Sequence, residues 1–245
     1  MITAVVLTRN EARFIAGCLD SLRLVTDDIL VIDSRSTDRT AEIAAGMDAR
    51  VEYVDWQGFA GTRNFALDRC RLSSWLLFVD ADERVPPGLA RELQATVNAA
   101  RSDVDGFLIP RRNVICGRIM RAGGWWPDYQ LRLMRPGRCR YPEDAAVHEA
   151  ARCAGTVLAL NMPLIHLNYR TWREFFRKQL SYARLAGASS PNLRRRSYLG
   201  APTRSFWRRF VSEQGFLDGL HGLTAAGIIG LAEIYRVWVA RRSDP

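Results

Sequence analysis

The sequence predicts an α/β fold built on a mixed, mainly parallel sheet flanked by helices, with a helical C-terminal extension. Three observations support this prediction. Short apolar runs alternate with amphipathic segments through the first hundred residues, two of these runs end in aspartate, and the pattern after residue 170 is helical and rich in arginine. Strands that alternate with helices form βαβ units, and such units build parallel sheets.

The first hundred residues contain four expected strands, each followed by an expected helix. The strands are short apolar runs and the helices have apolar residues at helical spacing. We expect strands at residues 2–7, 28–33, 49–54 and 75–80, and helices at residues 10–22, 36–46, 59–70 and 86–100. Gly46 ends the second helix, and prolines lie in the first turn of the fourth. Ligands bind beyond the carboxyl ends of such strands, which is where Asp33 and Asp80 lie.

The second part of the chain has a different order of expected strands and helices. Residues 106–115 and 129–135 are expected strands, and the loop between them is rich in glycine and tryptophan. Expected helices follow at residues 171–188, 205–214 and 216–240. We divide the chain into a first domain of residues 1–170, with halves at 1–103 and 104–170, and a basic helical extension of residues 171–245.

The last apolar stretch runs from Gly222 to Ala232 and is bounded by His221 and Glu233. We expect it to be too short to span a bilayer, which requires about 20 apolar residues. Two interpretations remain open: it lies in a membrane interface beside the neighbouring arginines, or it packs on the rest of the protein.

The composition is that of a globular protein, with 48% hydrophobic and 25% charged residues, but the net charge is +9 and the pI is about 9.9. Such a surplus favours an anionic partner, namely phosphate, nucleic acid or an acidic membrane surface; solvated arginines are the alternative. The chain has no helix-turn-helix, RNP-like or zinc-finger pattern, which argues against a nucleic-acid-binding protein. It also has no Gly-x-Gly-x-x-Gly after a strand, which argues against a Rossmann oxidoreductase.

The five cysteines are scattered and none forms a Cys-x-x-Cys pair: Cys18, Cys70, Cys116, Cys139 and Cys153. We therefore expect neither a structural zinc site nor a disulfide framework, and a reducing compartment fits this pattern. The first residues have no basic region or cleavage site, so we expect no signal peptide and a cytoplasmic protein.

Asp80 and Asp82 stand one residue apart where the buried strand "WLLFVD" ends. Two carboxylates placed in this way converge and repel each other, so a cation is a reason to keep them together. Oxygen ligands favour Mg²⁺ or Mn²⁺, which bind through one or two carboxylates and the phosphates of a ligand. The alternative is that both aspartates cap the following turn.

Several motifs together carry a resemblance to a known family. "LTRNE", "VIDSRSTDRT", "WQGFAGTRNFAL" and "WLLFVDADERVPPGL" resemble the family 2 glycosyltransferases, which have the GT-A nucleotide-sugar-binding fold. "GGWWPDYQLRLMR", "AVHE" and "GFLDGLHGL" are similar to the lipopolysaccharide-core β-1,4-glucosyltransferase group within that family. The resemblance implies a nucleotide-binding half at residues 1–103 and an acceptor half at residues 104–170.

The resemblance implies nucleotide-binding roles for five residues before the aspartate pair. Thr8 and Glu11 match positions that line the nucleoside pocket. Asp33 matches the acid that hydrogen-bonds the uracil or the ribose. Arg63 and Asn64 match the pair that borders the base and the diphosphate.

The metal site is also implied by the resemblance. Asp80 matches the residue near the ribose and the metal, and Asp82 matches a direct metal ligand with a part in catalysis. His166 is the candidate further ligand for Mn²⁺ or Mg²⁺, and a satisfied core histidine is the alternative. Arg9 stands where the family usually has tyrosine, at a position whose side chain need not face the ligand. A divalent ion between the phosphates would stabilise the departing diphosphate.

An inverting transfer needs a base for the acceptor hydroxyl, and residues 144–149 offer Asp144, His148 and Glu149. Glu149 is the candidate base because the resembling group has a Val-His-Glu segment there, with His148 beside it on the acceptor side. A surface glutamate in an ion pair is the alternative.

The acceptor would meet aromatic and charged residues of the loop and of the strand after it. Tryptophan and tyrosine stack on sugar rings, and arginine pairs bidentately with phosphate or carboxylate; packing in a second core is the alternative for the tryptophans. The candidate acceptor-binding residues are Trp125, Trp126, Asp128, Tyr129, Arg132 and His148. A cluster of arginines could hold a phosphorylated lipid or the inner leaflet, or be a solvated loop: Arg194, Arg195, Arg196, Arg204, Arg208 and Arg209.

The resemblance implies a metal-dependent inverting glycosyltransferase that moves a hexose, glucose from UDP-glucose, to a cell-envelope glycan such as an inner-core heptose of lipopolysaccharide. Its place would be the inner face of the cytoplasmic membrane, in peripheral contact and without nucleic acid. The alternatives are an acceptor in capsule, exopolysaccharide, protein or lipid carrier, or, from another class, a basic nucleic-acid-binding protein.

Overall fold

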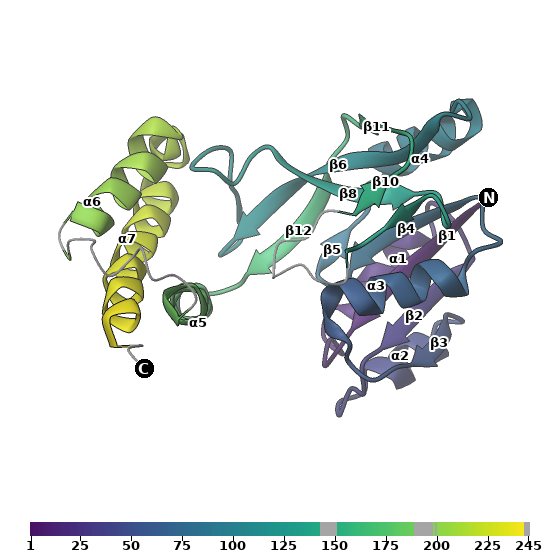
Figure 1. Cartoon of the computed structure of the whole chain (residues 1–245), viewed down its shortest axis with the longest axis horizontal. Coiled ribbons are helices and arrows are strands. Elements are labelled where there is room, and N and C mark those ends of the chain that lie inside the picture. The colour runs from purple at the N-terminus through teal and green to yellow at the C-terminus, as the bar shows by residue number, and fades with distance from the viewer. Residues whose placement is uncertain (143–150, 189–197, 199, 243–245) are drawn as a thin grey trace. The chain divides into compact units, whose positions relative to one another are not determined.

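A computed structural model describes residues 1–142, 151–188, 198 and 200–242 (Figure 1). The chain divides into two compact units. Unit 1 consists of Met1–Arg111 and Tyr129–His166, and unit 2 consists of Arg112–Asp128 and Leu167–Pro245.

The main sheet of the described residues has ten strands in the order β3–β2–β1–β4–β8–β6–β12–β5, with β7 and β11 also paired to β6. Its strands are β1 (Ile2–Thr8), β2 (Ile29–Asp33), β3 (Arg50–Tyr53), β4 (Trp75–Asp80), β5 (Glu83–Arg84), β6 (Val104–Ile115), β7 (Arg118–Ile119), β8 (Asp128–Met134), β11 (Thr156–Ala159) and β12 (Leu164–Tyr169). Strands β1 to β4 pair in parallel, whereas β8 pairs with β4, and β5 with β12, in antiparallel fashion. The predicted mixed, mostly parallel sheet is confirmed.

Four helices cover the two faces of the parallel part of this sheet: α1 (Ile15–Leu22), α2 (Thr40–Gly46), α3 (Gly58–Arg69) and α4 (Pro87–Ala99). Successive residues of a strand point to opposite faces, so β1 contributes to two cores. Val6 packs in the core that includes α1 and α4, and Val5 packs in the core that includes α3. Burial on both faces explains why these strands are continuously apolar.

Helix α1 begins at Ile15, five residues after the start that the sequence predicts. Asn10 has a φ of 60°, and the Glu11 backbone N–H donates to Thr40 Oγ1 at 2.8 Å. The first residues after β1 therefore form a loop that is tied to the segment after β2.

Helices α5 (Trp172–Ala188), α6 (Gly200–Trp207) and α7 (Gly219–Arg242) form most of unit 2. Glycines allow close packing here, because a Cβ at Gly187 would lie 2.7 Å from the Arg236 carbonyl oxygen. The helical C-terminal region is thus confirmed.

The C-terminal helix matches the helix expected at residues 216–240, but its apolar part is longer than expected. Among the described residues, Gly215–Arg242 is the single helical segment long and apolar enough to cross a membrane by length and composition, although a core helix passes the same test. The expectation of a stretch too short to span a bilayer concerned only residues 222–232. The helix continues on both sides of that stretch because His221 and Glu233 do not interrupt it.

Cys139 and Cys153 form a disulfide, which corrects the expectation of no disulfide. They are directly opposite each other in the antiparallel pair of β9 (Cys139–Arg140) and β10 (Arg152–Cys153), with a Cα–Cα distance of 4.0 Å. The sequence spacing of these cysteines does not indicate this pairing, because it depends on a strand register.

Candidate active site

The carboxyl ends of β1, β2 and β4 bring three predicted site residues to one edge of the sheet. Thr8 pairs with Asp33 in the β1–β2 register, and Leu7 pairs with Asp80 in the β1–β4 register. The chain builds β2 and β3 on one side of β1 and then β4 on the other. Ligands of open α/β sheets bind outside the carboxyl ends of the strands at such a reversal of strand order.

Asp33 is fully buried, and its carboxylate accepts three hydrogen bonds. Thr8 Oγ1 donates to Oδ2 at 3.1 Å, the Ser36 backbone N–H donates to Oδ1 at 2.7 Å, and the Ser36 hydroxyl donates to Oδ2 at 2.5 Å. Hydrogen bonds of this kind satisfy a buried carboxylate and fix its orientation. Thr8, Asp33 and the loop that carries Glu11 therefore form one rigid group.

Asp80 and the buried Glu83 share the guanidinium group of Arg132. Arg132 donates to both Asp80 oxygens, and its Nη2 lies 2.6 Å from Glu83 Oε1. Arg63 Nη2 lies 3.6 Å from Asp80 Oδ1, and Arg111 Nη1 lies 3.3 Å from Glu83 Oε1. Since the Arg132 side chain is only 4% exposed, this ion network belongs to the interior of unit 1.

The network perturbs the protonation of its members. Burial by itself raises the pKa of Asp80, but the charges of Arg132 and Arg63 outweigh it and hold that pKa below the ordinary value. Burial by itself lowers the pKa of Arg132, but the charges of Asp80 and Glu83 outweigh it and raise that pKa. Both groups are therefore charged at neutral pH.

Asp82 and His166 face each other beside this network. His166 Nε2 lies 3.3 Å from Asp82 Oδ2, and both side chains are partly exposed. The antiparallel pairing of β5 and β12, in which His166 lies opposite Glu83, produces this arrangement.

A divalent cation would find two of its three predicted ligands together here. Asp82 and His166 converge, whereas the Asp80 oxygens are occupied by Arg132, and the described residues contain no cluster of three His, Cys, Asp or Glu that could hold a metal. A carboxylate and an imidazole fit a cation that takes further ligands from phosphate oxygens. The donor set is thus compatible with a metal bound together with a diphosphate.

Arg63 and Asn64 of α3 have different surroundings. The Arg63 guanidinium lies 5.4 Å from the centre of the Tyr141 ring, and its buried Nε has no hydrogen-bond partner among the described residues. The Asn64 amide accepts from the Tyr141 N–H at 2.9 Å and donates to the Tyr141 carbonyl at 2.8 Å. Asn64 thereby holds Tyr141 against α3, and Arg63 extends toward Asp80.

The predicted acceptor residues are distributed over both units. Trp125 packs against Tyr169 and Phe175, with ring centres 6.4 and 5.9 Å apart, as in the core-packing alternative. Trp126 lies beside Arg112. Unit 2 contains the candidates Trp125, Trp126 and Asp128, whereas unit 1 contains Tyr129 and Arg132.

Some candidates lie outside the described residues: Asp144, His148, Glu149, Arg194, Arg195 and Arg196. Conversely, Glu83 and Arg111 belong to the network although no role was predicted for them, and Arg132 was predicted to bind the acceptor. The third acid of "DADE" was the only indication of Glu83. Its partner Arg132 is 49 residues away, a distance at which sequence spacing indicates no contact.

Comparison with known proteins connects this geometry with one family. The family model described as "Glycosyl transferase family 2" matches residues 3–153. The chain is 32% identical over 195 residues to the lipopolysaccharide core biosynthesis glycosyltransferase LpsC of Rhizobium meliloti, a match that covers 75% of the chain and 69% of LpsC. It is 37% identical over 93 residues to the uncharacterized glycosyltransferase RC0292 of Rickettsia conorii, which covers 38% of the chain and 33% of that protein.

Among solved structures, residues 1–349 of TarS from S. aureus superpose with a TM-score of 0.53 at 17% identity, covering 97% of the chain and 90% of the TarS chain. At this identity the likeness shows the fold alone, which is the GT-A fold expected from the resemblance.

Proposed function

The chain belongs to glycosyl transferase family 2, and on this premise we propose that it transfers a hexose, glucose from UDP-glucose, to an envelope glycan with inversion at the sugar carbon. The acceptor would be a sugar of the lipopolysaccharide core, because the relative LpsC is named as a glycosyltransferase of lipopolysaccharide core biosynthesis. One observation carries the proposal: buried Asp33, Asp80 and the Asp82–His166 pair gather at the carboxyl edge of the sheet, where strand order reverses.

In this proposal the nucleoside binds against the group around Asp33. The Asp33 carboxylate is fixed by Thr8 and Ser36, so it is oriented before the ligand arrives and pays little entropy on binding. The carboxylate would accept hydrogen bonds from the uracil N–H or the ribose hydroxyls. Glu11 lies on the loop tied to the same group, and residues 1–103 form the nucleotide-binding half.

The diphosphate would bind between Arg63 and the Asp82–His166 pair. Asp82 and His166 would hold a divalent ion, Mn²⁺ or Mg²⁺, which when bound supplies Lewis-acid stabilisation of the leaving diphosphate. The Arg63 guanidinium adds a positive charge beside Asp80. Because Arg132, Arg63 and Arg111 together balance the charges of Asp80 and Glu83, the region is less negative than its acids alone suggest, which favours an anionic substrate.

Glu149 would accept the proton of the acceptor hydroxyl on the face of the sugar opposite the diphosphate. In a Glu149→Gln variant we expect UDP affinity to be retained and turnover to fall at least about 100-fold. Equal losses of UDP affinity and turnover would contradict this role. Glu42→Gln, which removes an exposed carboxylate on α2, is the matched control.

The donor is tested by thermal unfolding of the protein with UDP-, GDP-, TDP- and CMP-sugars, with and without Mn²⁺. A true donor at 100 times its dissociation constant adds about 2.7 kcal/mol to the free energy of unfolding. We expect UDP-glucose with Mn²⁺ to stabilise most, and stabilisation by none of the four would refute the donor assignment.

We also propose that α7 lies on the anionic inner face of the cytoplasmic membrane. Its residues Leu220, Leu223, Leu231, Ile234 and Trp238 are all exposed, between 39% and 77%. Their spacing of three, eight, three and four residues corresponds to one side of a helix. An exposed apolar stripe of this length has the form of an interfacial helix.

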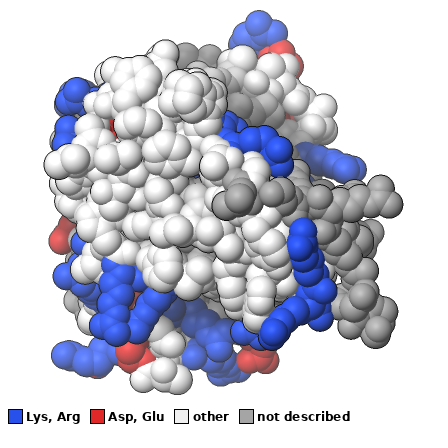
Figure 2. Space-filling view, turned by 90° about the vertical axis from the view of Figure 1, so that its left-hand side faces the viewer, with Lys and Arg blue, Asp and Glu red and all other residues white. Residues whose placement is uncertain are grey.

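The residues around this stripe favour an anionic lipid surface as its binding partner. Figure 2, which faces the side of unit 2 with α6 and α7, shows a broad surface without charge that is bordered by Lys and Arg. Arg241 and Arg242 lie at the end of α7, and the chain carries a net charge of +9. Basic residues beside an apolar face attract anionic headgroups.

A further inference from the structure

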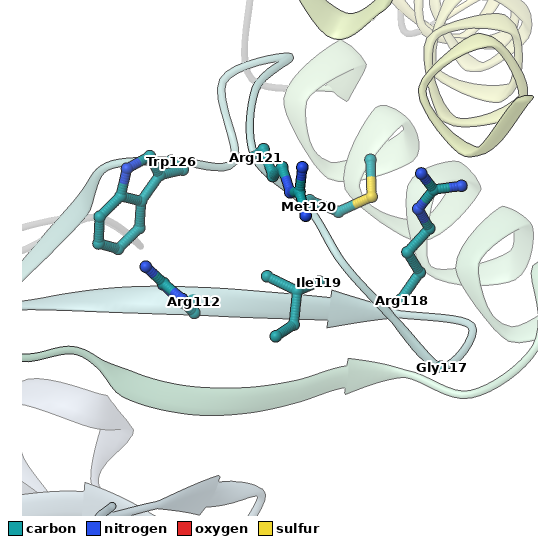
Figure 3. Close-up of a pocket in the computed structure, with 7 residues that line it drawn as sticks. All are labelled: Arg112, Gly117, Arg118, Ile119, Met120, Arg121 and Trp126. Carbon is teal, nitrogen blue, oxygen red and sulfur yellow. The ribbon is translucent and has the colours of Figure 1, made fainter. Parts of the chain in front are cut away.

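Unit 2 contains a pocket, and the residues proposed to bind the donor are not among those that line it. Its volume is about 620 Å³, within the range of roughly 300–1,000 Å³ that is usual for small-molecule sites. The lining residues are Arg112, Gly117, Arg118, Ile119, Met120, Arg121 and Trp126 (Figure 3).

A tight β-hairpin forms the floor of this pocket. Cys116 and Gly117 have φ values of 49° and 79°, and they connect the end of β6 to β7. A type I′ turn requires positive φ at both of its central residues, and its twist matches that of paired strands. The turn places Arg118 opposite Ile115 and Ile119 opposite Val114.

Hydrogen bonds hold the segment after the hairpin in place. The buried carboxylate of Asp218 accepts the backbone N–H groups of Arg121 at 3.0 Å and Ala122 at 3.1 Å. The Met120 N–H donates to the Asn113 carbonyl at 2.9 Å. The pocket is therefore formed before a ligand arrives, which lowers the entropic cost of binding.

In the part of the chain that the structure describes, the three arginines of the pocket have no carboxylate partner. Arg112, Arg118 and Arg121 are exposed, no Asp or Glu lines the pocket, and no ion pair involves any of the three within the described residues. Asp218 is satisfied by backbone N–H groups near Arg121. Three like charges around one concavity repel each other, and a multiply charged anion would remove this repulsion.

The aromatic and apolar side chains of the pocket point to a sugar next to that anion. The Arg112 guanidinium lies 5.2 Å from the centre of the Trp126 ring, and contact with an aromatic face leaves the N–H donors at the guanidinium edge free to bind phosphate. Figure 3 shows Arg112 and Trp126 at one end and Arg118 at the other, with Ile119, Met120 and Arg121 between. Indole and aliphatic surfaces pack against the C–H faces of sugar rings.

We propose that this pocket binds a phosphorylated sugar, the phosphate at the arginines and the ring against Trp126, Ile119 and Met120. The inference rests on the proposed function, since the phosphosugar would belong to the acceptor glycan. It identifies Arg112, Arg118 and Arg121 as residues that select an acceptor carrying phosphate.

The test is the binding of glucose 6-phosphate, glucose and inorganic phosphate to the full chain, measured by calorimetry. We compare wild type with Arg112→Gln/Arg118→Gln/Arg121→Gln and with a control of equal charge, Arg71→Gln/Arg173→Gln/Arg177→Gln, whose residues are exposed and lie outside the pocket. We expect wild type to bind glucose 6-phosphate at least about tenfold more tightly than either glucose or phosphate. The pocket variant should lose at least about tenfold of that affinity, and the control should lose less than about threefold.

Equal affinity of wild type and pocket variant for glucose 6-phosphate would overturn the proposal, as would equal loss in the control. A lipid headgroup is the other source of the same chemistry. If the pocket variant lost binding to vesicles containing phosphatidic acid but not to glucose 6-phosphate, the phosphosugar assignment would be wrong. UDP binding with Mn²⁺ is measured on the same proteins: its absence in wild type contradicts the proposed function, whereas its presence with an inert pocket contradicts only this inference.

Discussion

In unit 1, Arg132 is buried between Asp80 and Glu83, whereas in unit 2 Arg112, Arg118 and Arg121 line an open pocket that has no Asp or Glu among its described lining residues. A buried guanidinium must be paired, because an isolated charge in the interior costs several kcal/mol. An exposed guanidinium is solvated and needs no partner, so it is available for an anionic ligand. The same residue type thus supports the architecture of one unit and is available for binding in the other.

Helices α1 of unit 1 and α7 of unit 2 also differ in which side chains they bury. The buried face of α1 packs in the core with Ile15, Cys18, Leu19 and Leu22, as expected for a helix on a sheet. Helix α7 buries glycines, alanines and two valines, while leucines and a tryptophan are exposed. These exposed side chains contribute little to the interior of unit 2, whereas Ile228 and Ile229 of the same helix pack against its core.

The largest expected effect is on the free energy of unfolding, and it compares the buried Arg132 with the exposed Arg118. Arg132→Met leaves Asp80 and Glu83 without their shared partner, so the free energy of unfolding should fall by about 3–5 kcal/mol. Arg118→Met removes an exposed charge and should change it by no more than about 0.5 kcal/mol. Urea unfolding measures both, and similar losses would show that the two arginines do not differ in this way.

The next effect concerns the site of unit 1. Asp82→Asn removes a ligand of the proposed ion, so sugar transfer should fall by about 100-fold or more, equivalent to ~2.7 kcal/mol. Mn²⁺ affinity in the presence of UDP should fall with it, and His166→Ala should lower the same affinity. The pocket variant of unit 2 should retain UDP–Mn²⁺ binding. Unchanged Mn²⁺ affinity in both single variants would remove Asp82 and His166 from the metal site.

A smaller effect would sharpen the comparison of helices. Leu220→Glu and Leu231→Glu place charge in the exposed stripe of α7, and each should weaken binding to anionic vesicles at least about tenfold. Leu24→Glu and Leu72→Glu change exposed leucines of unit 1, which are 46% and 101% exposed, and serve as matched controls. Vesicle sedimentation that gave equal losses for the two pairs would contradict a membrane role of α7.

The smallest effect is on the acid dependence of stability. The pKa of Asp80 is depressed in the folded protein, so its contribution is fully present above the ordinary carboxyl pKa of about 4 and is lost as pH falls through the folded pKa. Because a third of this side chain is exposed, solvent screening reduces the loss to the order of 1 kcal/mol. The free energy of unfolding, measured with urea between pH 6 and pH 3, should therefore decline less steeply with falling pH for Arg132→Met than for wild type. Equal slopes would show that Arg132 does not set this pKa.

Much of the fold is predictable from the sequence because it depends on local pattern. The apolar runs of β1, β2 and β4 and the helical spacing of α3 and α4 indicate a parallel α/β sheet, and the predicted bounds of these elements agree with the structure to within about two residues. The strands β11 and β12 were not predicted. The strands β5, β7, β9 and β10 were not predicted either, because each of these four has two residues, too few to show a period.

Some features of the candidate site were also predictable from the sequence, and others were not. The sequence itself determined the acids at strand ends, since a run of apolar residues that stops at Asp33 or Asp80 places a carboxylate at the sheet edge. The tertiary structure alone decided that Arg132 neutralises Asp80, that His166 faces Asp82, that Cys139 meets Cys153, and that three arginines near a hairpin share one pocket. Periodicity reports the environment of one segment, whereas these contacts depend on the register between strands far apart in the chain, which is fixed only when the whole sheet and its helices pack together.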